Sequence, residues 1–154
     1  MRTKTVKRHW CDFCNRAGLQ AHAMAKHERH CTMNPARACR ACRLIDGGNG
    51  PDAAELRALV AILPANVVPE YDHRGQEAQP YVDFLKAMEE VGPKLREAAG
   101  GCPACMLAAI RQAGVPVPLV AGFDFKKEMA EVLAAAARAE QEEREAYRIP
   151  VYYS

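Results

Sequence analysis

Four residues near the start of the chain have the types and spacing of a zinc site. Cys11, Cys14, His27 and Cys31 fit the pattern C-x2-C-x12-H-x3-C. Zinc in structural sites takes four Cys or His ligands in a tetrahedron, so three thiolates and one imidazole close such a site. The short spacings place each pair of ligands on one turn of chain. Two further histidines in the same segment are rival ligands, His22 and His30.

The remaining four cysteines form two pairs with the same internal spacing. Two residues separate Cys39 from Cys42, and two separate Cys102 from Cys105. Four thiolates complete a second tetrahedral site, so the two pairs are expected to share one ion. An odd cysteine count usually leaves a spare thiol, whereas here all seven are used. The sequence therefore predicts two zinc ions as cofactors.

The charge is distributed unevenly along the chain. Residues 1–45 carry ten Lys or Arg and two acidic residues, a net charge of +8. The remaining residues carry eleven basic and seventeen acidic side chains, a net charge of −6, which together give the formal net charge of +2. A basic segment joined to an acidic body is typical of a protein that binds a polyanion, and nucleic acid is the first candidate.

Cysteine usage and hydropathy indicate the compartment. The sequence has no apolar run long enough to cross a bilayer and no N-terminal export pattern. CxxC pairs in a reducing compartment favour metal binding over disulfides. We therefore expect a cytoplasmic protein, or one held in a nucleoprotein or virion assembly, that is neither secreted nor membrane-bound.

The apolar periodicity predicts a mostly α protein. We expect a small zinc-finger module followed by a zinc-clipped helical domain and a long C-terminal helix. Only 6% of the residues are aromatic, so the core must rely on Ala, Leu, Val and Met, and metal would supplement it. The expected units are a basic zinc-finger module over 1–35, a helical body over 36–122, and an amphipathic helix with an extended tail over 123–154.

Breakers and apolar stripes place the helices. We predict helices over 19–31, from Pro51–Asp52 to Pro64, over 80–91, over 102–113, and from Asp124 to about Arg148. Knuckles are expected around Cys11–Cys14 and Cys39–Cys42. Gly92-Pro93 is expected to interrupt the third of these segments, over 80–91, before a short helix continues to Ala99.

Residues 9–32 resemble the Cys-Cys-His-Cys variant of the zinc-finger family. The ligands Cys11, Cys14, His27 and Cys31 carry the likeness, and Met24 stands where the family places its core Leu. The resemblance implies base-reading positions at Gln20, Ala23 and Lys26. One finger spans only about three base pairs, so contacts to phosphate should dominate binding. The residues expected to make those contacts are Arg2, Lys4, Lys7, Arg8, Arg29, Arg37, Arg40 and Arg43.

The paired CxxC motifs resemble a treble-clef arrangement with a helical insertion. Cys102 and Cys105 are expected at a helix start, where backbone N–H groups stabilise thiolates. Cys39 and Cys42 precede the Gly-rich segment 46–50, as a knuckle would. The intervening helices would then form a hairpin whose ends are joined by metal.

Two enzymatic interpretations compete with a structural one. Cys102–Cys105 at a helix start also looks like a thioredoxin-type redox motif, although no βαβ pattern precedes it. CxxC pairs on either side of Asp72-His73 resemble the order of an HNH nuclease, in which His73 would activate water beside a metal. Residues 106–113 supply no second His or Asn for that metal. We therefore expect a protein without catalytic residues, with His73 and Asp72 as the weak candidates.

The residues favour a non-catalytic zinc protein that binds nucleic acid or serves as a nucleoprotein adaptor. The alternative is a protein–protein assembly component, for instance a small virion or packaging protein, with purely structural zinc. In that case the apolar stripe Phe125, Met129, Val132 and Leu133 and the Tyr-rich tail would contact a partner protein. The sequence does not decide whether the nucleic acid is DNA or RNA, or what the oligomeric state is. It also does not decide whether this last helix belongs to the core or to an interface.

Overall fold

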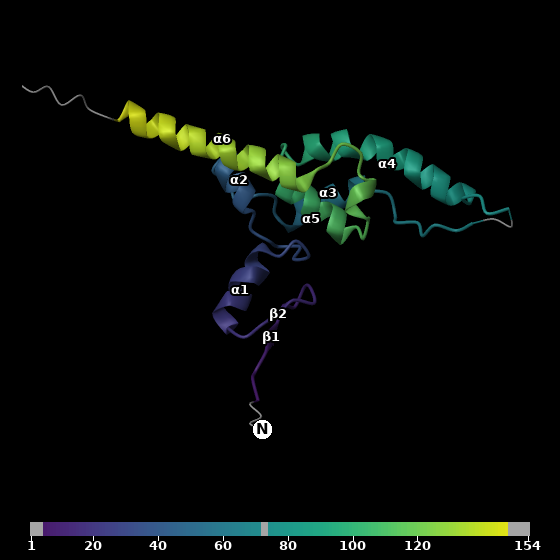
Figure 1. Ribbon diagram of the computed structural model, residues 1–154, viewed down its shortest axis with the longest axis horizontal. Coiled ribbons are helices and arrows are strands. Elements are labelled where there is room, and N and C mark those ends of the chain that lie inside the picture. Colours follow the sequence, from purple (N-terminus) through teal and green to yellow (C-terminus); the bar gives the residue numbers. More distant parts are fainter. Residues whose placement is uncertain (1–4, 72–73, 148–154) are drawn as a thin grey trace, which may run out of the picture.

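The computed structural model describes residues 5–71 and 74–147, and within these ranges it is mostly helical, as predicted. None of the described helices is both long enough and apolar enough to cross a membrane. The helical part extends in two directions, and the N-terminal segment projects from its middle (Figure 1). The elements are β1 (His9–Trp10), β2 (Ala17–Gly18), α1 (Ala21–His30), α2 (Arg40–Ile45), α3 (Ala53–Ile62), α4 (Gln79–Ala98), α5 (Pro103–Gln112), the 3₁₀ turn η1 (Val117–Leu119) and α6 (Phe125–Ala146).

The N-terminal segment is a small ββα unit. Strands β1 and β2 pair antiparallel, with His9 opposite Gly18 and Trp10 opposite Ala17. Helix α1 follows two residues after β2 and ends before Cys31. A Cβ at Gly18 would lie 3.2 Å from Cε of Met24, a tight contact, so glycine leaves room for the Met24 side chain next to the hairpin.

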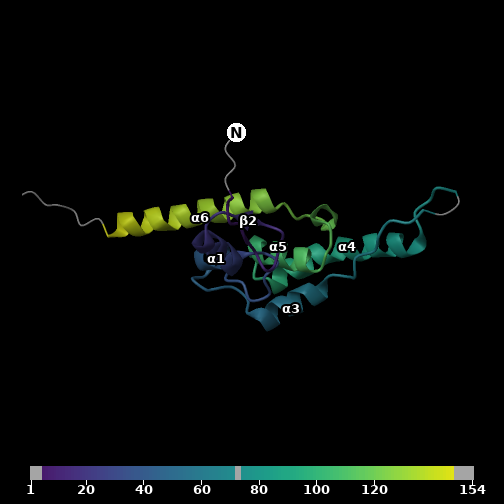
Figure 2. The ribbon, with the colours of Figure 1, turned by 90° about the horizontal axis from the view of Figure 1, so that it is seen from below.

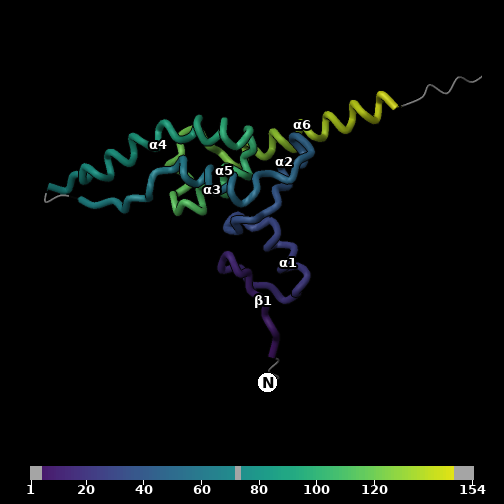
Figure 3. Tube along the Cα trace, turned by 180° about the vertical axis from the view of Figure 1, so that it is seen from behind, coloured from purple at the N-terminus to yellow at the C-terminus, as the bar shows by residue number. Residues whose placement is uncertain are grey.

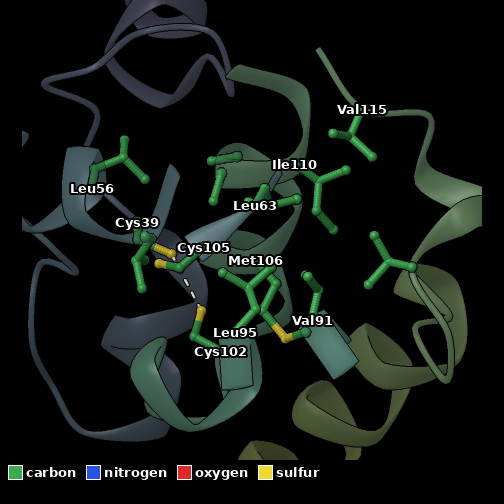
Figure 4. Packing of buried hydrophobic residues seen from close by; sticks show 14 of the residues in the cluster. Cys39, Leu56, Leu63, Val91, Leu95, Cys102, Cys105, Met106, Ile110 and Val115 are labelled. Atoms are coloured by element: carbon green, nitrogen blue, oxygen red, sulfur yellow. Dashed lines mark hydrogen bonds between the residues drawn. The ribbon is translucent and has the colours of Figure 1, made fainter. Parts of the chain in front are cut away.

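Helix α5 forms the centre of the helical body. Seven of its ten residues are buried, including Met106 and Ile110, which are fully enclosed. Helices α2, α3, α4 and α6 all contact it. Leu56 of α3 and Leu95 of α4 belong to the same buried cluster as Met106, and the cysteines of the second predicted site lie at one edge of this core (Figure 4).

Helix α3 begins where the sequence predicts. Asp52 is the N-cap, and its carboxylate accepts hydrogen bonds from the backbone N–H groups of Ala54 and Glu55. The Glu55 carboxylate accepts from the Asp52 N–H in return, which completes a capping box. The helix buries Leu56 and Leu59 and ends at Ile62, two residues before the predicted end at Pro64.

Helix α4 differs from the expectation at Gly92-Pro93, because it runs through both residues without a break. Val91 and Leu95 are buried one turn apart on the same face, whereas Pro93 is exposed. Continuing the helix keeps both apolar side chains in the core, which offsets the hydrogen bond that Pro93 cannot make. Gly92 lets the loop after η1 approach, since a Cβ there would collide with the Ala121 carbonyl oxygen.

Helix α6 begins after Asp124, whose carboxylate accepts from the N–H groups of Lys126 and Lys127. Its first half rests on α5 and α2, and its second half extends beyond the body (Figures 1 and 2). Phe125, Met129 and Val132 are half-buried, and no residue of α6 is fully buried. A bidentate ion pair, Arg96 to Glu128 at 2.6 and 2.9 Å, fastens α6 to α4.

The segment after α1 connects the ββα unit to α5. The Gln112 side chain donates to the backbone oxygens of Thr32 and Asn34, and Arg111 donates to the Thr32 hydroxyl. The buried Asn34 side chain donates in turn to Glu28 O at 2.8 Å, near the end of α1. The ββα unit therefore joins the body through defined hydrogen bonds, while β1 and β2 lie on its far side (Figure 3).

Candidate metal centres

The first candidate metal centre contains the four residues selected by spacing. The potential ligand atoms of Cys11, Cys14, His27 and Cys31 all lie within 4.8 Å of one another. Cys11 and Cys14 flank the turn after β1, and His27 is presented by the last turns of α1. The Cys14 Sγ to His27 Nε2 distance is 3.3 Å. A zinc ion with ordinary bond lengths would hold such a pair about 3.5 Å apart, so the cluster fits a tetrahedral ion.

The rival histidines lie outside this cluster. His30 directs Nδ1 to the carbonyl oxygen of Ala38, to which it donates at 2.9 Å. His22 is exposed on the first turn of α1. His27 is thus the histidine that the fold brings to the three cysteines, in agreement with the C-x2-C-x12-H-x3-C spacing.

Little else holds the ββα unit together. Its buried cluster comprises Cys11, Met24 and Cys31, with Cys14 packed against it. Met24 is the single buried side chain in that cluster that is not a cysteine, which is far less apolar area than a stable domain buries. A metal ion bound by the same cysteines would supply the missing stabilisation.

The second candidate centre joins two distant helix N-termini. Cys39 is the N-cap of α2 and Cys102 is the N-cap of α5, and Cys42 and Cys105 follow three residues later in each helix. The knuckle expected at Cys39–Cys42 is therefore wrong, because α2 begins there. Each pair lies at the positive end of a helix dipole, which stabilises thiolates. The predicted sharing of one site by the two cysteine pairs is confirmed in position.

The sulfur positions of this centre also fit a tetrahedral ion. Cys39 Sγ lies 3.6 Å from Cys102 Sγ, and Cys42 Sγ lies 3.5 Å from Cys105 Sγ. Four sulfurs about 2.3 Å from a central zinc would be about 3.8 Å apart. All four cysteines are free thiols and all four are buried, and Figure 4 labels three of them, Cys39, Cys102 and Cys105. The geometry is consistent with a closed structural site with no open position for substrate.

The thiols of this centre affect one another's ionisation. Hydrogen bonds from Cys102 and Cys105 hold the pKa of Cys39 far below its usual value. Burial raises the pKa of Cys42 to about 12, and hydrogen bonds with Cys102 and Cys39 raise the pKa of Cys105. Four thiolates cannot accumulate in so small a buried volume by themselves. A divalent cation would allow it, since a coordinating thiol is deprotonated outright.

Neighbouring groups also shift the pKa values of the thiols in the first centre. A hydrogen bond with His27 lowers the pKa of Cys14 to about 7. Burial is the main cause that raises the pKa of Cys31. The cluster therefore already contains one thiol that ionises near neutral pH, which suits the capture of a cation.

A buried arginine faces the second centre. The Arg37 side chain is only 7% exposed, and its Nη1 lies 3.9 Å from Cys105 Sγ and 3.4 Å from the Ala104 carbonyl oxygen. Its Nε is buried without a hydrogen-bond partner in the described part of the chain. Four thiolates and one divalent cation would carry a net charge of −2, so a guanidinium here would act as a counter-ion. The expectation that Arg37 contacts phosphate is wrong, because it is enclosed.

Gly50 gives the second centre the space it needs. Its φ of +83° is the left-handed conformation that glycine adopts without strain. A Cβ there would collide with Cβ of Cys39 and would lie 3.3 Å from Cys42 Sγ. The Gly-rich segment 46–50, which the sequence shows only as a loop, thus packs against two of the ligands.

Apart from the enclosed Arg37, the described residues expected to contact nucleic acid lie on the surface. Lys7, Arg8, Gln20, Lys26 and Arg29 are all exposed, while Arg2 and Lys4 lie outside the described residues. A groove of about 650 Å³ follows α1, and the three implied base-reading positions, Gln20, Ala23 and Lys26, all line it. Arg16 and Arg40 add two more cations, and no carboxylate appears among the described residues that line the groove.

The weak catalytic candidates Asp72 and His73 lie outside the described residues. An isolated antiparallel bridge joins Tyr71 to Glu77 on either side of them. These flanking residues precede α4, whereas Cys102 follows its C-terminal end (Figure 1). The two Cys/His clusters are the metal-ligand groups found in the described part of the chain, and neither includes a residue of this segment.

No family model, no curated protein and no solved structure matches the chain. The two clusters and the charged surface beside the first are therefore the features that bear on function. The spacing in the sequence predicts the metal ligands of both clusters. Arg37 and Gly50 do not, because each contacts the second centre only through the folded arrangement.

Proposed function

We propose that the chain is a non-catalytic zinc protein that binds nucleic acid through its N-terminal ββα unit. Zinc is the proposed ion at both centres, because thiolate-rich tetrahedral sets are typical of structural zinc. The ββα order and the C-x2-C-x12-H-x3-C ligands support a finger of the Cys-Cys-His-Cys variety for the first centre. We call residues 5–31 the finger from here on.

The groove along α1 is the observation on which the proposal rests. Arg16, Lys26 and Arg40 line it, and the residues described along it include no carboxylate. A concave surface with cations alone attracts phosphate, and Gln20 offers an amide that can read a base edge. Because one finger reaches few bases, we propose that binding depends mainly on phosphate contacts and varies little with sequence.

The second centre has a supporting role in this proposal. Its four cysteines are buried and Arg37 covers it from one side, so it presents no surface to a ligand. It joins the starts of α2 and α5, and the chain between them forms α3 and α4. We therefore assign it to holding the body on which the finger is mounted.

A salt titration of binding tests the proposal. Fluorescence anisotropy with a labelled 20-nucleotide duplex and a labelled single strand should show affinity that falls steeply with salt. Lys26→Glu should weaken binding of either probe and reduce the salt slope by about one unit, since about one phosphate contact is lost. Arg138→Glu is the matched control, because Arg138 is an exposed cation on α6 away from the groove.

Two results would contradict the proposal. One is no binding of either probe at low salt by the zinc-loaded chain. The other is equal loss of affinity in Lys26→Glu and Arg138→Glu, which would mean that the groove has no special part. Native mass spectrometry of each variant should still show two zinc ions, so that a loss of binding is not a loss of fold.

The second candidate function is assembly with a partner protein. Exposed apolar side chains favour it: Leu133 of α6 is 54% exposed, and Leu44 and Ile45 of α2 are also exposed. Helices α2 and α6 contact each other, so these groups belong to neighbouring elements (Figure 1). Light scattering of the purified chain would detect self-association, and Leu133→Asp should abolish it. If the chain is a monomer at all concentrations, its partner is not a second copy of this chain.

A further inference from the structure

Trp10 is the only tryptophan of the chain, and it stands exposed on the finger hairpin. Its side chain is 60% exposed, although burial of an indole is strongly favourable. Phe13, in the turn that follows β1, is 40% exposed. The finger therefore presents two aromatic rings to solvent while its own buried cluster contains none.

The strand register shows which way Trp10 faces. Gly18 faces α1, since a Cβ there would contact Met24. Trp10 pairs with Ala17, one position before Gly18 in β2. Neighbouring residues of a strand point to opposite faces, so Trp10 lies on the face of the hairpin turned away from α1. The aromatic surface is thus separate from the interior of the finger and available to a ligand.

Three exposed cations lie on or next to the hairpin that carries Trp10. Lys7 and Arg8 precede β1 and are exposed, and the exposed Arg16 lies beside β2, with its carbonyl oxygen accepting from the Cys11 N–H at 2.9 Å. Asp12 is the carboxylate within residues 5–20, and the Glu28 carboxylate of α1 reaches the same turn, where it accepts from the Asp12 N–H at 3.0 Å. Exposed rings among cations are the combination that binds unpaired nucleotides, because bases stack on the ring while phosphates meet the cations.

We propose that Trp10 is a stacking platform for an unpaired base, so that the finger prefers single-stranded nucleic acid to duplex. This inference rests on the proposed function and narrows its ligand to single strands, loops or ends. Charge complementarity favours this occupant over an apolar protein surface. Paired bases in a duplex present their edges in the grooves and not their faces, so a duplex cannot use the ring.

The single tryptophan makes the test direct. A dT10 strand added to the zinc-loaded full chain should quench Trp10 fluorescence, whereas a 10-base-pair duplex bound at the same occupancy should leave it nearly unchanged. Trp10→Ala should weaken dT10 binding about fivefold to a hundredfold and change duplex binding by less than about twofold. Trp10→Phe should restore part of the loss. Tyr71→Ala is the control, because Tyr71 is an exposed aromatic outside the finger.

The outcomes separate this inference from the proposed function. Binding of both probes with equal affinity, without quenching and without an effect of Trp10→Ala, overturns the stacking platform and leaves the proposed function intact. Binding of neither probe overturns both. If Trp10→Ala abolishes self-association detected by light scattering but not dT10 binding, the surface contacts protein, and the inference is wrong. Retention of two zinc ions in Trp10→Ala verifies that the finger remains folded.

Discussion

Removing the ion from the four-cysteine centre should destabilise the helical body far more than removing it from the finger. The centre links Cys39 to Cys102, which lie 63 positions apart in sequence. All four of its cysteines belong to the main buried cluster, whereas the finger has a separate cluster. We therefore expect Cys42→Ser to lower the melting temperature of the body, and Cys14→Ser to leave it almost unchanged.

The size of the effect follows from loop closure. A cross-link over 63 positions restricts the unfolded chain by an amount equivalent to about 4 kcal/mol in the free energy of unfolding. Domains are stable by about 5–15 kcal/mol in total, so the loss is a large fraction. For a chain of this length about 1 kcal/mol shifts the melting temperature by roughly 2–4 °C. Loss of the link should therefore lower it by about 8–16 °C.

Thermal denaturation followed by circular dichroism at 222 nm measures this shift, since the helices of the body dominate the signal. Zinc-loaded wild type, Cys42→Ser and Cys14→Ser should be compared at equal concentration. A strong chelator added to the wild type should reproduce the Cys42→Ser curve. A shift below about 2 °C for Cys42→Ser, or equal shifts for both variants, would refute the idea that this centre holds the body together.

Other parts of the second centre and the α4–α6 contact give further expectations. Gly50→Ala should lower zinc occupancy to about one ion in native mass spectrometry, whereas Gly47→Ala, at φ +75° but with no atom nearby, should retain two. Arg37→Met should weaken zinc binding about 10- to 100-fold in a chelator competition, because the counter-ion is lost. Arg96 lowers the pKa of Glu128 below its usual value, so this pair stabilises the fold above the unfolded-state pKa, and the stability is lost as the pH falls through the folded-state pKa. Acid titration of the unfolding free energy should show this loss, and Arg96→Ala should reduce it.

The metal ligands could be predicted because their geometry is largely local. Two cysteines separated by two residues fit one turn of chain, and a histidine four residues before a cysteine lies on the same helix face. The choice of His27 over His30 also has a local cause, since His30 is engaged by the Ala38 carbonyl oxygen. Helix starts at Asp52 and Asp124 followed from capping chemistry, which depends on the next three residues alone.

The features that the sequence did not predict depend on contacts between distant segments. In the sequence Arg37 looks the same as the surface cations around it, because its contact with Cys105 forms only when α5 packs beside it. The break expected at Gly92-Pro93 is absent because Val91 and Leu95 both enter the core, which local propensity does not include. The start of α2 at Cys39 was missed because a six-residue helix has too few positions to show a period.

The number and placement of bound ions test the account most directly. Native mass spectrometry of the full chain, purified without chelator, should detect two zinc ions per chain. Cys14→Ser and Cys42→Ser should each retain one, and the double variant none. Fewer than two ions in the wild type, or two ions retained in either single variant, would contradict the assignment of all seven cysteines and His27 to two tetrahedral centres.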